Sequence, residues 1–245
     1  LYMRITAYPF PAAVSEKRYF NNTVIVVDVL RASTSMVESL QNGAAQIIPA
    51  RDAGEATAFA AHLGRKESLL AGENGGLKMQ GFDLGNSPLE QSRDVVEGKT
   101  VVFCTTNGTA AIHAARNASM LLIGCLRNRT AVAKYAAGFP DDILLLCAGT
   151  NGECSIDDVV AVGGIYRALL DELGEDAQIE NNDFAQVCLF MYTKWREGAF
   201  GISMAAHYRK LRELGFEKDL AFCLDQDRSA CVPRYENGSL RNIMQ

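Results

Sequence analysis

Five segments of the chain are rich in glycine, amide, hydroxyl and carboxylate residues, the types that together hold a bound anion or the metal ion beside it. In chain order they are residues 28–34, a long loop with 72–78 and 81–88, then 105–109, 128–130 and 149–153. Each segment follows a run of apolar residues with the composition of a buried strand. Polar turns at the carboxyl ends of parallel strands meet at one edge of a sheet, which is where ligands bind in α/β folds. The pattern therefore predicts one polar site built from five distant parts of the chain.

Asp28, Glu73 and Asp157 are the candidate metal-binding carboxylates. Asp28 ends an apolar run, where a carboxylate is costly to bury unless it binds a metal ion, pairs with a cation or accepts hydrogen bonds. Arg31 follows three residues later, so an Asp28–Arg31 ion pair is the structural alternative. Glu73 lies between glycines that would let the loop wrap around a ligand. Asp157 falls in the first turn of a predicted helix, where it could simply complement the helix dipole.

The segment 105–109 has the composition of an anion cradle. Gly108 would let the backbone turn with its amides exposed, and the helix that begins there would aim further N–H groups at the same point. Segment 149–153 repeats this pattern, and for both segments an ordinary turn with a capping side chain is the alternative. The candidate substrate-binding residues are Ser33, Asn86, Thr105, Thr106, Asn107, Gly108, Thr109, Asn128, Thr150 and Glu153.

Several common catalytic motifs are absent from the sequence. It has no phosphate-binding G-x-x-x-x-G-K-[ST] loop, no G-x-G-x-x-G dinucleotide fingerprint, no G-x-S-x-G nucleophile elbow and no C-x5-R phosphatase loop. His207 lies one helical turn after Ser203, so the two could face one site. The other two histidines, His62 and His113, lie in helical runs and are predicted to be surface or packing residues.

The composition is that of a mildly acidic globular chain, with 245 residues, 48% of them hydrophobic, and a formal net charge of −5. These values exclude intrinsic disorder and disfavour a nucleic-acid partner. No apolar stretch approaches the ~20 residues of a membrane span, and no signal region is recognised, so we expect a cytoplasmic protein with no membrane partner. The seven cysteines, never spaced C-x-x-C, are expected to be small buried hydrophobes rather than disulfides or zinc ligands.

Strand-like apolar runs alternate with helix-like segments along the chain. Strands are predicted at 23–29, 46–49, 68–71, 100–104, 120–124, 142–147 and 231–235, and helices at 33–41, 52–63, 109–117, 128–137, 156–173, 184–195 and 204–214. The alternation predicts an α/β fold, a Rossmann-like three-layer α/β/α sandwich with a mainly parallel or mixed sheet. We expect a single domain over 1–245, with the helical part at about 175–245 as a candidate subdomain.

Four of the polar segments resemble the motifs of the 2-phosphosulfolactate phosphatase family. The matching strings are VDVLRAST at 27–34, GENGGLK at 72–78 with GFDLGNSP at 81–88, TTNGT at 105–109 and CAGTNGE at 147–153, in the family's order. The resemblance runs from about residue 23 to residue 164. It is weaker further on, where Tyr208 follows His207 in place of the glycine of the family pattern.

The resemblance implies a Mg²⁺-dependent phosphatase that converts (2R)-phospho-3-sulfolactate to 3-sulfolactate and phosphate, a step of coenzyme M or sulfolactate biosynthesis. Asp28, Arg31 and Glu73 would then be catalytic, with Arg31 balancing the sulfonate or the phosphate. Asp28 and Glu73, with Asp157 behind them, would hold Mg²⁺, which prefers oxygen ligands. The partner would be a small anionic phosphate ester, and we expect a homodimer.

Other functions remain open on the sequence alone. The chain could hydrolyse another small 2-phospho acid, or bind phosphate esters and other anions without catalysis. A phosphatase of the haloacid-dehalogenase type is disfavoured, because it needs a second aspartate two residues after Asp28, where Leu30 stands. A dehydrogenase-like fold without its fingerprint is a further alternative.

Overall fold

The computed structural model describes residues 2–244 and is built on an eleven-stranded sheet. The strands are β1 (Tyr2–Tyr8), β2 (Asn22–Val27), β3 (Gln46–Pro49), β4 (Ser68–Asn74), β5 (Leu77–Lys78), β6 (Thr100–Cys104), β7 (Met120–Gly124), β8 (Asp142–Cys147), β9 (Gln178–Asn181), β10 (Pro233–Glu236) and β11 (Ser239–Asn242). Their order in the sheet is β5-β4-β6-β3-β11-β10-β7-β2-β8-β1-β9.

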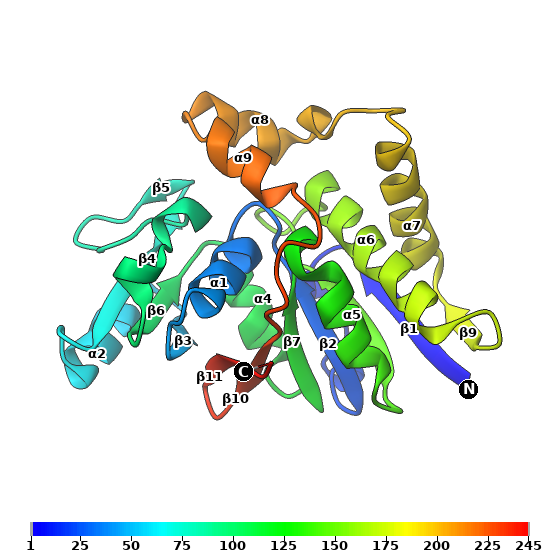
Figure 1. Ribbon diagram of the computed structural model, residues 1–245, viewed down its shortest axis with the longest axis horizontal. Coiled ribbons are helices and arrows are strands. Elements are labelled where there is room, and N and C mark those ends of the chain that lie inside the picture. Colours follow the sequence, from blue (N-terminus) through cyan, green and yellow to red (C-terminus); the bar gives the residue numbers. More distant parts are fainter. Residues whose placement is uncertain (1, 245) are drawn as a thin grey trace.

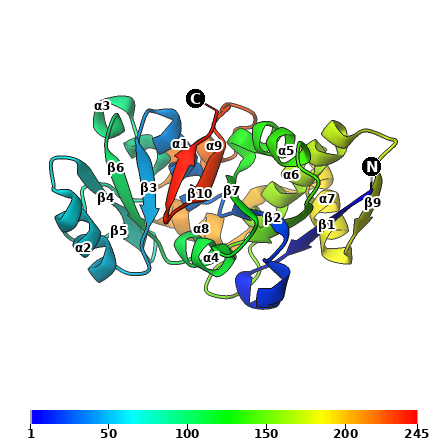
Figure 2. The same cartoon turned by 90° about the horizontal axis from the view of Figure 1, so that it is seen from below.

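Nine α-helices and five 3₁₀ turns are described within residues 2–244. The helices are α1 (Ala32–Gln41), α2 (Ala53–Leu63), α3 (Arg93–Val96), α4 (Gly108–Ala115), α5 (Arg129–Ala137), α6 (Ile156–Leu173), α7 (Asp183–Arg196), α8 (Ala206–Glu213) and α9 (Glu217–Cys223). The 3₁₀ turns are η1 (Pro11–Ala13), η2 (Glu16–Arg18), η3 (Pro88–Glu90), η4 (Leu126–Asn128) and η5 (Ile202–Met204). Figure 2 shows α1, α5 and α6 on one face of the sheet and α2 and α4 on the other. The predicted three-layer α/β/α fold is therefore confirmed.

The sheet consists of two parallel parts joined by an antiparallel hairpin. Strands β4, β6 and β3 are parallel to one another, as are β7, β2, β8, β1 and β9. The hairpin β10–β11 lies between the two parts and pairs antiparallel with β7 and β3. Its turn has positive φ at Asn237 and Gly238, the backbone that a two-residue hairpin turn requires. The sheet is thus mixed.

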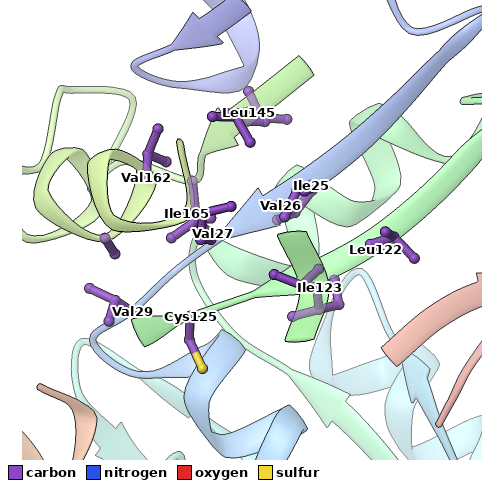
Figure 3. Close-up of a cluster of buried hydrophobic side chains, with 14 of the residues drawn as sticks. Ile25, Val26, Val27, Val29, Leu122, Ile123, Cys125, Leu145, Val162 and Ile165 are labelled. Atoms are coloured by element: carbon purple, nitrogen blue, oxygen red, sulfur yellow. The ribbon is translucent and has the colours of Figure 1, made fainter. Parts of the chain in front are cut away.

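Strand β2 lies at the centre of the core. Its residues 24–27 are all buried, because helices cover both faces of the sheet and leave no side of the strand to solvent. Figure 3 shows residues 25–27 among side chains of β7, β8 and α6, including Ile123, Leu145 and Ile165, which belong to the same buried cluster. Each fully buried side chain of this kind contributes about 1.5–3 kcal/mol. The packing fixes where β2 ends, and therefore where Asp28 lies.

Residues 175–245 contribute to several parts of the fold. Strand β9 pairs with β1 at the sheet edge, α7 packs on α6, and the hairpin β10–β11 enters the middle of the sheet. Figure 1 shows α8 and α9 above one end of the molecule, at the opposite end from the β10–β11 turn. Whether these residues are a subdomain stays a prediction, but α8 and α9 cover the end where the site lies.

Two further features of the described residues concern membrane-spanning helices and cysteines. Across the part of the chain that the structure describes, no helix combines the length and the apolar character needed to cross a membrane. All seven cysteines are free thiols; six are buried as expected, and Cys154 is exposed. Burial raises the pKa of buried thiols such as Cys104, to about 11, so these cysteines are packing residues rather than nucleophiles.

Candidate active site

A polar cleft lies where β2, β4, β6 and β8 end, beneath α8. The structure brings seven of the predicted site residues to its wall: Asp28, Arg31, Glu73, Asn86, Thr106, Asn107 and Thr150. The remaining lining residues are Leu30, Gly75, Gly76, Asn151, His207, Lys210 and Leu211. Four polar turns that are far apart in the sequence therefore share one site, as the strand ends predicted.

Asp28 occupies the floor of the cleft directly after β2. Its backbone N–H donates to Ser33 Oγ (2.8 Å), and the Ser33 N–H donates to the Asp28 carbonyl (2.9 Å), so Ser33 fixes the turn from strand to helix. A Cβ on Gly108 would lie 2.8 Å from Asp28 Oδ2, so only glycine leaves room for the carboxyl group. Burial is the main reason that the pKa of Asp28 rises to about 6, and His207 opposes this rise.

Two further carboxyl groups lie behind Asp28, at the start of α6. Asp158 accepts hydrogen bonds from Val29 N–H (2.9 Å) and Gly149 N–H (3.0 Å), so it ties together the turns after β2 and β8. Asp157 is buried, and its Oδ1 has no hydrogen-bond partner among the described residues. Burial raises the pKa of Asp157 to about 6 and that of Asp158 well above its usual range. A cation bound near these buried carboxyl groups would therefore stabilise their ionised forms.

Glu73 links two other turns at the cleft. Its Oε1 accepts from Thr106 N–H (2.8 Å) and its Oε2 from Gly76 N–H (2.6 Å), and the side chain is buried. Each oxygen keeps a second lone pair. Glu73 therefore holds the β4–β5 loop against the turn after β6 and can still serve as a ligand.

Arg31 is buried and does not pair with Asp28. Its Nη1 donates to Asp219 of α9 (2.7 Å), its Nη2 donates to the Gly76 carbonyl (2.6 Å), and its guanidinium lies 4.0 Å from the centre of the Phe216 ring. Asp219 also accepts from Ser87 Oγ (2.8 Å). The alternative Asp28–Arg31 ion pair is therefore wrong, and Arg31 instead connects the turn after β2 to α9 and to the β4–β5 loop.

The turn after β6 is held by its own threonines. Thr105 N–H donates to Thr109 Oγ1 (3.3 Å), and Thr109 N–H donates to Thr105 Oγ1 (3.2 Å), so both side chains are used inside the turn. Asn107 Oδ1 accepts from Asn151 N–H (3.0 Å), which joins this turn to the one after β8. Asn107 makes no side-chain cap on α4. The Thr109 N–H is used by Thr105 Oγ1, whereas the N–H groups of Asn107 and Gly108 have no hydrogen-bond partner within residues 2–244.

The other predicted residues are not among those lining the cleft: Ser33, Thr105, Gly108, Thr109, Asn128, Glu153 and Asp157. Asn128 is fully buried, accepts from Cys125 N–H (2.8 Å) and donates to the carbonyls of Ile123 (3.1 Å) and Cys231 (2.9 Å). It therefore holds the chain near Cys231 against the turn after β7. Glu153 is exposed, and its backbone pairs with Thr150. Gly108 and Asp157 stand directly behind the wall, next to Asp28.

His207 and Lys210 bring α8 into the site. His207 Nε2 lies 2.6 Å from the Leu30 carbonyl and must carry the proton that it donates there, while its buried Nδ1 has no partner within residues 2–244. The spacing predicted that Ser203 and His207 could face one site; His207 lines the cleft, but Ser203 is not among its lining residues. Asp219 and Lys210 lie on helices with no motif, so sequence reasoning missed them.

The donor set suits a hard divalent cation. Asp28 and Glu73 line the cleft, and Asp157, whose Oδ1 has no partner within residues 2–244, lies behind it; His207 is the single His or Cys side chain among the lining residues. Within residues 2–244 no group of three His, Cys, Asp or Glu side chains could hold a metal ion unaided. Mg²⁺ ordinarily uses one or two carboxylates, with water and phosphate oxygens as its other ligands. The residues present therefore fit Mg²⁺ bound together with a phosphate ester.

Comparison with known proteins decides the family. The model of the 2-phosphosulpholactate phosphatase family matches residues 8–238. The chain belongs to this family. A probable 2-phosphosulfolactate phosphatase of Caldanaerobacter subterraneus subsp. tengcongensis is 36% identical over 240 residues, covering 98% of each chain. A protein of that name from Clostridium acetobutylicum is 37% identical over 228 residues, covering 93% of this chain and 95% of its own.

The family assignment confirms the resemblance seen in the sequence motifs. A third relative, the probable 2-phosphosulfolactate phosphatase of Clostridium novyi, is 36% identical and covers 95% of this chain and 97% of its own. The matched region includes residue 208, where the family pattern was expected to have glycine. The chain is therefore an enzyme of a phosphoric monoester hydrolase family over nearly its whole length.

Proposed function

We propose that the protein is a Mg²⁺-dependent phosphatase that hydrolyses (2R)-phospho-3-sulfolactate to 3-sulfolactate and inorganic phosphate. The observation that supports this most directly is the convergence of Asp28, Glu73, Thr106, Asn107 and Thr150 on one cleft. Carboxylates beside open amides and hydroxyls are what hydrolysis of a phosphate monoester requires, since it depends on positioning and charge neutralisation.

Asp28 and Glu73 would hold Mg²⁺, with Asp157 directly behind them. When bound, the metal ion supplies charge neutralisation at the phosphoryl oxygens. The raised pKa of Asp28, caused mainly by burial, supports this role, because a nearby cation favours the ionised carboxylate. Without a cation the cluster holds more buried negative charge than His207 can offset.

The turn after β6 would hold the phosphoryl group. The N–H groups of Asn107 and Gly108 at the start of α4 have no partner within residues 2–244, and Thr106 and Asn107 line the cleft beside them. Thr105 and Thr109 act indirectly, because their mutual hydrogen bonds keep the turn open. Helix amino ends with free N–H groups bind phosphate in many folds.

Asp28 and His207 are the two groups placed to act on the bond that breaks. On one route Asp28 attacks phosphorus, and water then hydrolyses the aspartyl phosphate to release inorganic phosphate. On the other route Asp28 takes a proton from the water that attacks phosphorus. Both routes need the ionised form of Asp28. His207 is oriented by its Nε2–H bond to the Leu30 carbonyl (2.6 Å), so the doubly protonated ring would donate its Nδ1 proton to the departing ester oxygen and return to the neutral Nε2–H form. The phosphorus–oxygen bond of the ester then breaks and the alcohol leaves neutral.

The experiment that tests this function is phosphate release from phosphosulfolactate, phospholactate and phosphoglycerate, with Mg²⁺ and with EDTA. We expect phosphosulfolactate to give the highest kcat/KM and EDTA to abolish turnover. Equal turnover under chelation would contradict the metal assignment. A higher kcat/KM with another ester would make the protein a phosphatase of that 2-phospho acid. Ligand-induced stabilisation without phosphate release would make it a non-catalytic anion-binding protein.

We also propose that the protein is cytoplasmic, that it acts in coenzyme M or sulfolactate biosynthesis, and that it assembles as a homodimer. Activity on phosphosulfolactate supports the pathway, and sedimentation of the purified chain tests the homodimer.

A further inference from the structure

The cleft is too small to hold the whole of a substrate with three acidic groups. Its volume is about 30 Å³. Because one buried water molecule needs roughly 10–15 Å³, the cleft has room for about two or three groups of that size. A phosphoryl group can enter, but the carbon chain and its other acidic substituents must extend into an adjoining groove.

Three grooves adjoin the cleft and differ in charge. The groove of about 350 Å³ beside η1 is lined by Phe10, Pro11 and alanines and has no charged side chain among the described residues. The groove of about 630 Å³ beside β5 contains Arg51 and Lys78 but also two carboxylates, Asp52 and Glu73, and Arg51 is already paired with Glu55. Neither groove offers net positive charge to an acid.

The third groove, which we call the α8 groove, lies between the loop 150–156 and α8. Its volume is about 500 Å³, and its polar lining includes Thr150, Asn151, Ser155, Arg209 and Lys210. It shares four residues with the cleft: Thr150, Asn151, His207 and Lys210. Glu153 is its single carboxylate in the described chain, and it does not line the cleft. The α8 groove is therefore a continuous, positively charged extension of the cleft.

Lys210 is the cation at the junction. It lines both the cleft and the α8 groove and forms no ion pair anywhere in residues 2–244. The two nearby arginines already donate hydrogen bonds to other groups of the protein. Arg31 donates to Asp219 and to the Gly76 carbonyl, and Arg209 donates to the Met204 carbonyl.

Helix α8 is held firmly enough to present Lys210 to a ligand. Leu211, the next residue, is buried, and Leu211 and Leu214 pack against Gly76 so closely that a Cβ there would lie 2.8 Å from Leu214. The following helix, α9, is anchored by the buried Arg31–Asp219 ion pair. A lysine on an anchored helix loses less freedom on binding than one on a loop.

We propose that the α8 groove is the subsite for the substrate's sulfonate, and that Lys210 is the residue that recognises it. This inference rests on the proposed function, because it takes the ester phosphate to lie in the cleft. Lys210 then determines specificity for esters with a sulfonate over esters with an apolar substituent at the same position. Thr150 and Ser155, whose hydroxyls are 2.6 Å apart, add neutral donors on the opposite wall.

The test compares Lys210→Met and Lys210→Arg with Arg212→Met, a control on an exposed arginine of the same helix that lines none of these grooves. The substrates are phosphosulfolactate and phospholactate, which has a methyl group in place of the sulfonate-bearing carbon. We expect Lys210→Met to lower kcat/KM about 10-fold or more for phosphosulfolactate, the effect of one charged hydrogen bond. Phospholactate should change less than about 3-fold, and Lys210→Arg should restore most of the loss.

A parallel measurement separates this proposal from the proposed function. Titration calorimetry with 3-sulfolactate needs no turnover, and we expect Lys210→Met to weaken binding about 10-fold relative to Arg212→Met. Equal losses of kcat/KM with both substrates, or unchanged sulfolactate affinity, would overturn the subsite. If the wild type releases no phosphate, the proposed function fails, and the calorimetric comparison alone supports or overturns the role of Lys210.

Discussion

The buried ion pair between Arg31 and Asp219 is the contact that should couple α9 to the active site. Both side chains are almost fully enclosed, with 2% and 6% of their surfaces exposed. Asp219 holds two donors, Arg31 Nη1 at 2.7 Å and Ser87 Oγ at 2.8 Å. The substitution Asp219→Ala removes the acceptor that both donors share and leaves the Arg31 guanidinium buried without its counter-ion.

The expected cost can be worked from the burial of the pair. Removing one partner of a buried ion pair costs about 3–5 kcal/mol, because the remaining charge is not compensated. A matched control is Asp171→Ala, which breaks the Arg167–Asp171 pair at 51% and 57% exposure. Exposed pairs contribute about 0–1 kcal/mol. We therefore expect the two Asp→Ala variants to differ in the free energy of unfolding by at least about 2 kcal/mol.

Urea unfolding followed by circular dichroism measures this difference. The double variant Arg31→Met/Asp219→Leu should recover part of the lost stability, since an apolar pair of similar volume leaves no buried charge. It should not recover phosphatase activity, because Arg31 also holds the β4–β5 loop through Gly76. The reasoning is refuted if Asp219→Ala is no more destabilising than Asp171→Ala, or if the double variant is as active as the wild type.

Three further changes test individual parts of the account. Asp28→Asn should lower kcat by about 10²–10⁴-fold. The same variant should be more stable than the wild type in EDTA at pH 8, by up to about 3 kcal/mol. The pKa of Asp28 is raised to about 6 in the folded state from 3.8, so the stability of the wild type falls as pH rises through this window. If urea unfolding shows that the difference in stability between Asp28→Asn and the wild type does not widen between pH 4 and pH 8, this reasoning is contradicted. Gly108→Ala places a Cβ 2.6 Å from Ala32 Cβ, so it should lower the free energy of unfolding by about 1–3 kcal/mol and remove most of the activity. The control Gly138→Ala, at an ordinary φ of −73°, should have little effect on stability or activity. Equal shifts in melting temperature for the two variants would count against the close packing at Gly108. Asn128→Ala should destabilise the fold by about 1–3 kcal/mol through its lost buried hydrogen bonds but leave KM unchanged, and a raised KM in steady-state assays would show that it does bind substrate.

The sequence predicted the central strands well because their pattern is continuous and apolar. The bounds predicted for β3, β6, β7, β8 and α6 agree with the structure at every residue. Strands β1 and β9, at one end of the sheet, were missed: the first residues of β1 alternate between exposed and buried, and β9 is only partly buried. Their strand character comes from pairing with distant partners, which local composition does not reveal.

The hairpin β10–β11 shows a different limit. Only its first strand was expected, although Asn237-Gly238 between short strands is a strong hairpin signal. Its place in the middle of the sheet, between β3 and β7, depends on contacts with residues more than 100 positions away. No local pattern encodes such an insertion.

In the site too, residues at strand ends were predicted from the sequence, whereas residues that depend on the docking of a distant helix were not. Strand ends could be read from the sequence, so Asp28, Glu73, Thr106 and Thr150 were found and do meet in one cleft. Lys210 was missed because it reaches the cleft only through the docking of α8. Side chains that stabilise a turn, such as Thr105, have the same residue types as side chains that bind a ligand, and only the hydrogen bonds of the folded chain separate the two.

A crystal structure with Mg²⁺ and a phosphate mimic such as tungstate tests the central claim most directly. The account predicts Mg²⁺ on the Asp28 carboxylate, shared with Glu73 or Asp157, and the oxyanion against the amides of Asn107 and Gly108. An oxyanion bound elsewhere on the surface, or a metal ion that leaves Asp28 without a ligand contact, would contradict it.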